Sequence, residues 1–234
     1  MATAETNSGE MSDIPWSDVV RFVRQLSHDL RNHLNAVELQ SAYLGELATD
    51  PEMKDEIKRL RQMMSDLSTT LQKLSSSVAP AKPTLMSYRA SDFVEDLRRV
   101  VENGFPEKGL EWDVRVNDKK IEIDPQLLPQ ALLELFANAF RHDPSDKPAK
   151  VTVAIDGAEH FVLTLGEPKD HFELTTNNWG RGPLRRISQG HYGLGLNRAR
   201  SIIEAHGGRL LAQYDETSKT LFTRVILPLF NGPA

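Results

Sequence analysis

Apolar residues recur in heptads from Met53 to Val78, and this repeat constrains the fold more than any other feature of the sequence. An unbroken heptad repeat is typical of a long helix that packs along one side against other helices. The stretch therefore predicts one long, laterally packed helix. Its apolar positions are Met53, Ile57, Leu60, Met64, Leu67, Leu71, Leu74 and Val78.

A second helical pattern begins near Trp16 and stops before Asp50 and Pro51, which are typical of the start of a new helix. At ~1.5 Å per residue the two helices would be about 50 and 42 Å long. A hairpin of that length cannot cover both apolar seams, so we expect a homodimer that forms a four-helix bundle. The alternative is a hairpin packed on its own C-terminal domain. The first pattern comprises Val19, Val23, Leu26, Leu30, Val37, Leu44 and Leu47, with polar His33 and Gln40 at two positions.

The sequence changes character after the serine- and proline-containing stretch 75–83. Beyond it, alternating apolar runs and amphipathic stretches predict an α+β sandwich with one mixed sheet and about three helices. The Asp156-Gly157 pair predicts a hairpin turn, and Gly207-Gly208 predicts a helix end. We divide the chain into a leader (1–15), a helical hairpin (16–79), a linker (80–83), the sandwich domain (84–230) and a tail (231–234).

Composition excludes several classes of protein. Acidic residues outnumber basic ones by 33 to 28, which argues against a general nucleic-acid binder. The chain has no cysteine, so disulfides and thiolate metal sites are excluded. No apolar run is long enough for a membrane helix, and the polar, acidic N-terminus is not a signal peptide. We therefore expect a cytoplasmic protein without membrane or nucleic-acid partners.

The first candidate for chemistry is His28-Asp29-Leu30-Arg31-Asn32. His28 lies off the apolar seam and can face water, and Asn32 falls on the same helix face. Asp29 can accept a hydrogen bond from one imidazole nitrogen, which fixes the tautomer and leaves the other nitrogen free to attack an electrophile. Taken alone, the same pattern is found on ordinary solvated helices.

A second candidate lies in the predicted helix 125–142. Glu134, Asn138 and Arg141 form one polar stripe along it. The Asn amide can ligate Mg²⁺, the Arg can neutralise phosphate oxygens, and the Glu can orient or deprotonate a nucleophile. The simpler interpretation is an amphipathic helix with one wet face.

Two glycines, Gly193 and Gly195, stand directly before the predicted helix 194–206. Glycines allow close approach of the backbone to a ligand, and a helix N-terminus favours anions. The irregular stretch 166–193 is too long for a plain connection and is a candidate lid. A plain turn and a solvated loop are the alternatives. Its basic residues, Lys169, Arg181, Arg185 and Arg186, could contact phosphates or an acidic partner.

In order and spacing, these motifs resemble the transmitter core of two-component histidine kinases over nearly all of residues 16–230. The segment 28–32 resembles the H-box, 124–142 the N-box region and 193–208 the glycine box with its helix. The resemblance implies a dimerisation and histidine-phosphotransfer hairpin followed by an ATP-binding sandwich of the Bergerat type.

The resemblance also implies roles for the first group of residues. His28 would be phosphorylated on a ring nitrogen, and Asp29 would orient it or act as a base. Asn32 would help to position the phosphate or a hydrolytic water.

Further roles are implied in the C-terminal domain, with ATP and Mg²⁺ as cofactors. Asn138 would ligate Mg²⁺ and Arg141 would contact phosphates, while Gly193 and Gly195 would let the lid wrap the triphosphate. Glu134 stands where many relatives have Asn, and some subfamilies have Glu.

The sequence departs from the family pattern in two places. His33 stands where many relatives have Pro. Where the family has Asp-x-Gly-x-Gly, residues 165–170 read Leu-Gly-Glu-Pro-Lys-Asp, so the Asp that recognises the adenine amino group is missing. Glu167 and Asp170 are the two candidates to replace it.

Three functions remain open at this stage. The chain could be an autokinase that phosphorylates His28 from ATP and passes the phosphoryl group to an Asp of a response-regulator receiver domain. It could be a phosphorelay histidine phosphotransferase with an ATP-free C-terminal domain. It could also be a non-catalytic dimeric adaptor, although an adaptor has no need of the H-box.

Overall fold

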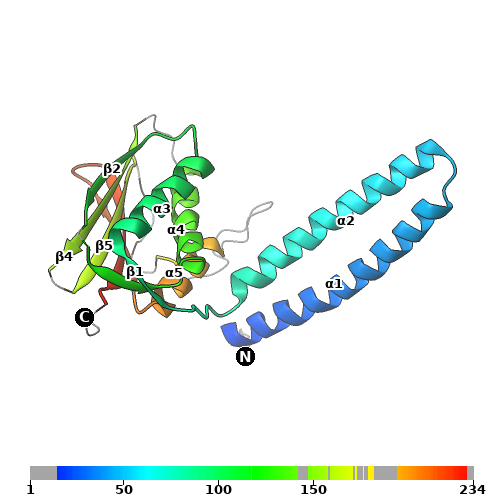
Figure 1. The fold of residues 1–234 in the computed structure, drawn as a ribbon, viewed down its shortest axis with the longest axis horizontal. Coiled ribbons are helices and arrows are strands. Elements are labelled where there is room, and N and C mark those ends of the chain that lie inside the picture. Colours follow the sequence, from blue (N-terminus) through cyan, green and yellow to red (C-terminus); the bar gives the residue numbers. More distant parts are fainter. Residues whose placement is uncertain are drawn as a thin grey trace, which may run out of the picture. The chain divides into compact units, whose positions relative to one another are not determined.

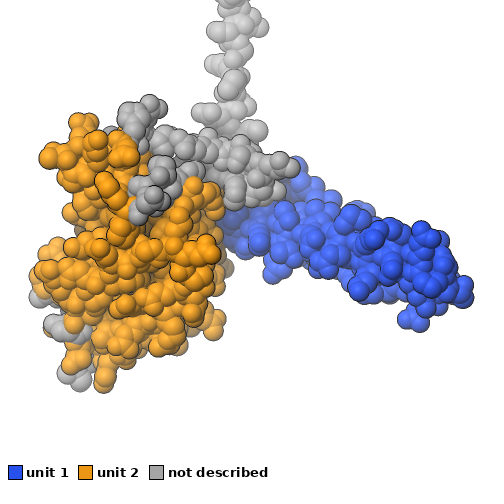
Figure 2. All heavy atoms as spheres, turned by 90° about the horizontal axis from the view of Figure 1, so that it is seen from above, with its two compact units in different colours: residues 1–79 blue, residues 80–234 orange. Residues whose placement is uncertain are grey.

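In the computed structural model, two long helices account for the described chain from Trp16 to Val78: α1 (Trp16–Leu47) and α2 (Pro51–Val78) (Figure 1). They belong to the first of two compact units, Met1–Ala79 and Pro80–Ala234 (Figure 2). The structure describes residues 15–116, 118–141, 147–157, 159–170, 172, 176, 179–181 and 194–230. No helix among these residues is long and apolar enough to span a bilayer.

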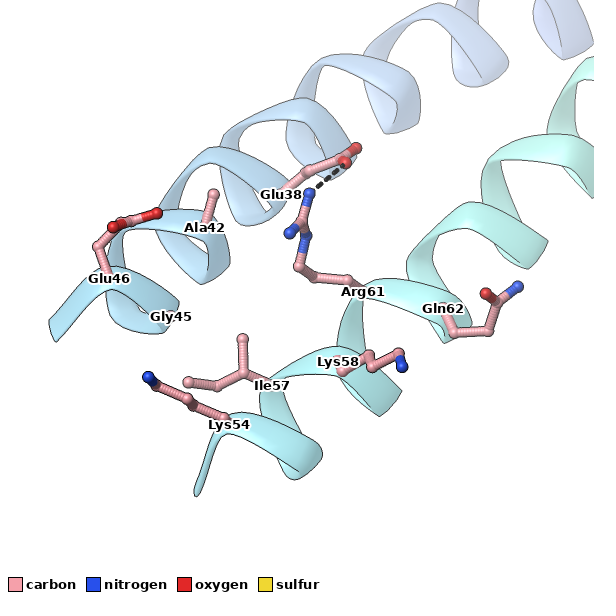
Figure 3. A pocket seen from close by; sticks show the side chains of 9 residues that line it. All are labelled: Glu38, Ala42, Gly45, Glu46, Lys54, Ile57, Lys58, Arg61 and Gln62. Carbon is pink, nitrogen blue, oxygen red and sulfur yellow. Dashed lines mark ion pairs between the residues drawn. The ribbon is translucent and has the colours of Figure 1, made fainter. Parts of the chain in front are cut away.

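The heptad repeat of α2 splits between two environments. Met64 and Leu71 are buried and Ile57 is half-buried, which places this set at the contact with α1. Near the hairpin tip, Ile57 faces Gly45, and a Cβ at Gly45 would lie 3.7 Å from Ile57 Cγ2 (Figure 3). The alternate members stay on the surface. Met53, Leu60 and Leu67 are between 39% and 55% exposed.

Small residues, rather than the apolar repeat, make the buried face of α1. The two buried residues of α1 are Ser27 and Ser41. Their small side chains let the two helices approach closely. Of the expected apolar repeat, Val19 and Val23 are half-buried and the other five members remain on the surface of the single chain. Leu26, Leu30, Val37, Leu44 and Leu47 are between 39% and 60% exposed. One hairpin therefore leaves an apolar stripe on each helix.

The second unit contains two sheets, so the prediction of one mixed sheet was wrong. The short strands β1 (Met86–Arg89) and β3 (Lys120–Ile123) form a two-stranded sheet of their own. In addition, one isolated bridge joins Ile121 of β3 to Leu229. The main sheet is mixed, with β2 parallel to β4 and the other pairs antiparallel. Its order is β2 (Leu110–Arg115), β4 (Ala149–Asp156), β5 (His160–Pro168), β7 (Thr220–Pro228) and β6 (Arg209–Asp215).

Three helices cover one face of the main sheet, as predicted: α3 (Ala90–Gly104), α4 (Leu127–Arg141) and α5 (Gly195–Ala205) (Figure 1). Their apolar sides and the inner face of the sheet form the core. Phe93 of α3 meets Phe161 of β5 edge to face, with ring centroids 6.1 Å apart. This packing leaves the opposite side of each helix for polar residues.

The predicted helix end at Gly207-Gly208 is confirmed. Gly207 has a φ of 72°, and its N–H donates to Glu204 O at 3.0 Å, while the Gly208 N–H donates to Ile203 O at 3.0 Å. These two bonds form a Schellman motif, which satisfies the last carbonyls of α5.

The buried His206 joins the end of α5 to the start of α4. Its Nε2 accepts a hydrogen bond from the Asp124 N–H at 3.0 Å, and its Nδ1 lies 2.7 Å from Ile202 O. Accepting at one nitrogen and donating at the other requires the neutral ring with hydrogen on Nδ1. The Asp124 carboxylate accepts hydrogen bonds from the N–H groups of Thr84, Leu127 and Gln126, which lower its pKa.

The close packing at Gly208 gives a test of the fold. A Cβ there would lie 2.6 Å from Ile226 O and 2.7 Å from Leu227 Cδ2, so we expect Gly208→Ala to lower the free energy of unfolding by about 1–3 kcal/mol. A Cβ at Gly104 meets nothing within 4 Å, so Gly104→Ala is the matched control and should cause no loss. Urea unfolding measures both, and equal losses would contradict the packing described.

Candidate functional site

The side chain of His28 lies on the exposed side of α1 and is 66% exposed, as predicted for a residue off the apolar seam. Its Nδ1 lies 3.1 Å from Asp29 Oδ1, and the Asn32 amide nitrogen lies 3.4 Å from the same Nδ1. The two contacts require opposite tautomers of His28. The Asp29 carboxylate accepts a hydrogen bond and so requires a hydrogen on Nδ1, whereas the Asn32 amide donates and requires a lone pair there. The shorter contact, to a charged acceptor, is the stronger one. It favours hydrogen on Nδ1 and a lone pair on Nε2.

Gln25 extends this network and was missed by the sequence analysis. Its Nε2 donates to Asp29 Oδ1 at 2.9 Å, the same oxygen that His28 contacts. The available signal was a Gln four residues before an Asp on a helix, a spacing that allows such a bond. The hydrogen bond from His28, and then that from Gln25, hold the pKa of Asp29 below its ordinary value. The carboxylate is thus kept ionised beside the imidazole.

The polar stripe of α4 forms the second part of the candidate site. Glu134 and Arg141 are exposed and Asn138 is half-buried. A Cβ at Gly195, the first residue of α5, would collide with the Glu134 carboxylate. A side chain at position 195 would therefore displace the flexible carboxylate of Glu134 from its place beside the start of α5. A carboxylate is favourable at a helix N-terminus.

The structure thus brings Glu134 and Gly195 together, while other predicted residues lie elsewhere. His28, Asp29 and Asn32 belong to the first unit and form a cluster of their own. Gly193, together with Arg185 and Arg186 of the predicted lid, lies outside the described residues.

Of the two candidates for the missing Asp, Glu167 is the one in the interior. It follows Phe161, Leu163 and Leu165 along β5 and is only 4% exposed, whereas Asp170 lies on the surface. Lys169, expected as a loop residue for phosphates or an acidic partner, is instead 6% exposed and buried in an ion pair. Its Nζ lies 3.3 Å from Glu167 Oε2 and 3.5 Å from Ala139 O of α4.

Arg200 of α5 is a further residue that the sequence analysis missed. Its buried guanidinium donates to Trp179 O at 2.7 Å, to Leu210 O at 2.6 Å and to Glu204 Oε1 at 2.9 Å. Asn197 donates to Gly180 O at 3.0 Å. Two side chains of α5 therefore hold residues 179–180, in the middle of the predicted lid. A charged residue on a short amphipathic helix gave no sequence signal for this role.

The residues around α4 fit the polyphosphate end of a nucleotide. The Asn138 amide is a ligand type that Mg²⁺ accepts, and the Arg141 guanidinium matches phosphate oxygens. The absence of a side chain at Gly195 leaves room for the Glu134 carboxylate itself. At the inner end, by contrast, the Glu167 carboxylate already has a partner in Lys169.

The hydrogen bonds of Asp29 predict an order of pKa changes. Loss of a hydrogen bond to the ionised form raises a carboxyl pKa, so His28→Gln should raise the pKa of Asp29 more than Gln25→Leu does. As the pH falls through the folded-state pKa, protonation of Asp29 weakens both contacts and removes their stabilisation. Carboxyl NMR titration measures the shifts. Gln62→Leu removes an equivalent Gln–Asp bond on α2 and should leave Asp29 unchanged; a reversed order would contradict the network.

Comparisons with known proteins agree with this arrangement. Residues 123–231 match the family described as histidine kinase-, DNA gyrase B-, and HSP90-like ATPase. Sensor histidine kinase ZraS of Salmonella typhimurium is 24% identical over 206 residues, covering 85% of this chain and 43% of the relative. Sensor histidine kinase HprS of Escherichia coli is 27% identical over 230 residues, covering 90% and 48%. The chain spans less than half the length of these curated relatives.

The fold is also similar to solved structures. Full-length ShkA, crystallised in complex with AMPPNP, aligns with a TM-score of 0.66 and 18% identity over 92% of this chain and 47% of that one. The mycobacterial sensor histidine kinase MprB aligns with a TM-score of 0.52 over 62% of this chain. Residues 123–231 are therefore similar to the histidine kinase-, DNA gyrase B-, and HSP90-like ATPase family, and the chain as a whole is similar in sequence to sensor histidine kinases and in fold to ShkA.

Proposed function

We propose that this chain is a protein-histidine kinase transmitter: His28 takes a phosphoryl group from ATP and passes it to an Asp of a response-regulator receiver domain. The observation that carries the proposal is the contact between His28 Nδ1 and Asp29, which directs the lone pair of Nε2 to the exposed side of α1. The matches to sensor histidine kinases along most of the chain support it.

In this proposal Nε2 of His28 is the nucleophile. As the N–P bond forms, positive charge develops on the ring, and the Asp29 carboxylate on Nδ1 stabilises that charge. Gln25 holds the carboxylate in place. Asn32, one helical turn from His28, is positioned to contact the phosphoryl group or the water that hydrolyses it. The high exposure of His28 leaves it open to a receiver domain.

The C-terminal unit would hold the nucleotide. Asn138 would ligate Mg²⁺, Arg141 would contact phosphate oxygens, and Gly193 and Gly195 would give the backbone clearance for them. Glu134 would orient or deprotonate the nucleophile. ATP supplies the phosphoryl group, and the task of the protein is mainly positioning and charge neutralisation.

A phosphorelay phosphotransferase is the second candidate, and one observation favours it. Glu167, the interior carboxylate at the inner end of the nucleotide site, is paired with Lys169. If that pair kept nucleotides out, His28 would receive its phosphoryl group from a phosphorylated receiver domain. The adaptor hypothesis has less support, because an adaptor requires neither the Asp29 contact nor the stripe on α4.

Labelling with radioactive ATP and Mg²⁺ tests the acceptor. We expect acid-labile, base-stable label in the unmodified chain and at least a hundredfold less in His28→Gln, because Gln lacks the nucleophilic nitrogen. His33→Gln, which changes the neighbouring exposed histidine, is the matched control and should retain the label. Label that persists in His28→Gln would refute the role of His28. A chain labelled only by a phosphorylated receiver would favour the phosphotransferase.

We further propose that the exposed stripes of α1 and α2 pair with those of a second copy. The stripes repeat in heptads, with Leu30, Val37 and Leu44 on α1 and with Met53, Leu60 and Leu67 on α2. Heptad spacing fits a four-helix bundle, in which each hairpin covers the other. Burial of these side chains would supply about 1.5–3 kcal/mol for each large apolar residue.

Two leucines of α1 offer a controlled test of association. Leu44 belongs to the stripe, whereas Leu39 is 75% exposed on the other side of the helix. We expect Leu44→Glu to shift the protein at micromolar concentration from a dimer toward the 26.3 kDa chain, because a charge would be buried between copies. Leu39→Glu should remain dimeric in the same light-scattering experiment. A monomeric unmodified protein would instead favour a hairpin packed on its own C-terminal unit.

A further inference from the structure

We propose that Gln25 is a positioning residue for the phosphorylation of His28: acting through Asp29, it selects the imidazole tautomer whose Nε2 can accept a phosphoryl group. This inference rests on the proposed function, since it assumes that Nε2 is the nucleophile. In that reaction the bond from Nε2 to the γ-phosphorus forms and the bond from that phosphorus to ADP breaks, while the hydrogen on Nδ1 stays beside Asp29. Gln25 thereby sets the fraction of the chain that can react, and Asn32 opposes it.

The carboxylate of Asp29 is not held by core packing, because its side chain is 52% exposed. In the described part of the chain two groups hold it, and both contact Oδ1. His28 Nδ1 lies at 3.1 Å and Gln25 Nε2 at 2.9 Å. The bond with His28, and then that from Gln25, lower the pKa of Asp29, so this ionised group is an acceptor only. Without Gln25, the place of the carboxylate would depend on the imidazole alone.

The orientation of the Gln25 amide follows from its partner. Only the amide nitrogen carries hydrogens, whereas the amide oxygen would repel a carboxylate oxygen at 2.9 Å. Gln25 precedes Asp29 by four residues, and a Gln and an Asp at this spacing stabilise each other on a helix. The bond is therefore part of the regular geometry of α1.

Asn32 acts on the same ring nitrogen in the opposite sense. Its amide nitrogen lies 3.4 Å from His28 Nδ1 and can donate only when Nδ1 carries a lone pair. The hydrogen of the neutral ring is then on Nε2, which has no lone pair left for phosphorus. Water competes with both contacts, because His28 and Asp29 are exposed. In such a balance the additional bond from Gln25 to Asp29 favours the reactive tautomer.

Nitrogen-15 NMR of the full chain, labelled at histidine, tests the tautomer without ATP. Its chemical shifts distinguish a ring nitrogen that carries hydrogen from one with a lone pair, and His28→Gln identifies the signals of His28. At pH ~8.5, where an ordinary histidine is neutral, we expect the form with hydrogen on Nδ1 to predominate in the unmodified chain. Its ratio to the other form should fall about twofold in Gln25→Leu. An unchanged ratio would overturn the proposal.

Two further variants control the NMR experiment. Gln62→Leu removes the equivalent bond to Asp66 on α2 and should leave the ratio unchanged. Asn32→Ala removes the competing donor, so the form with hydrogen on Nδ1 should persist or increase. A fall in Asn32→Ala as large as that in Gln25→Leu would contradict the competition between Asp29 and Asn32.

Initial rates of labelling by ATP and Mg²⁺ connect the tautomer to the reaction. Gln and Leu are both good helix formers, so Gln25→Leu should remain folded. We expect it to lower kcat for labelling by about the factor by which the reactive tautomer falls. The KM for ATP should be unchanged, because Gln25 is not among the residues proposed to hold the nucleotide. A lower rate with an unchanged tautomer, or a changed tautomer with an undiminished rate, would overturn the positioning role.

These outcomes differ from those that would refute the proposed function. Absence of ATP-dependent label on His28 in the unmodified chain would contradict the kinase function, while a tautomer change in Gln25→Leu would still support selection by Gln25. Labelling of His28 that does not depend on Gln25 would contradict the inference and leave the kinase function standing.

Discussion

The packing of α4 against the main sheet is the interaction on which the candidate nucleotide site depends. Leu132 and Phe136 are almost completely buried on the inner side of this helix. An α-helix has about 3.6 residues per turn, so the burial of these two residues also determines the direction in which the stripe that contains Asn138 points. It also sets the Ala139 carbonyl against Lys169. The packing of α4 in the core thus also determines the geometry of the candidate site.

The sequence was sufficient to predict the helices and the exposed imidazole. Hydrophobic periodicity identified both long helices and the three helices of the second unit. The interaction of Asp29 with His28 followed from adjacency on a helix surface. Periodicity could not show which side of α1 faces α2, because the buried positions are Ser27 and Ser41. An apolar pattern shows what must be covered, but not by which neighbour.

The environment of Glu167 in the candidate site was beyond prediction for a different reason. Glu167 and Asp170 are close in sequence, but Glu167 lies within β5 on the side of Leu163 and Leu165, whereas Asp170 lies beyond the end of the strand. The partnership of Glu167 with Lys169 depends on tertiary burial, which composition does not encode. Arg200 is similar, since its two carbonyl partners, on Trp179 and Leu210, come from segments outside α5. The separate ladder of β1 and β3 likewise reflects pairing over a distance rather than local pattern.

The hydrogen bond from the Asp124 N–H to His206 joins two positions 82 residues apart in sequence. It ties the beginning of α4 directly to the end of α5, so a direct bond as well as the shared sheet sets the spacing of these helices. The strands β4 and β5, which lie between the two helices in sequence, belong to the core and must be kept. Only the segment 182–193, between Arg181 and α5, could therefore be lengthened or replaced in evolution, and it is the place to insert a reporter domain.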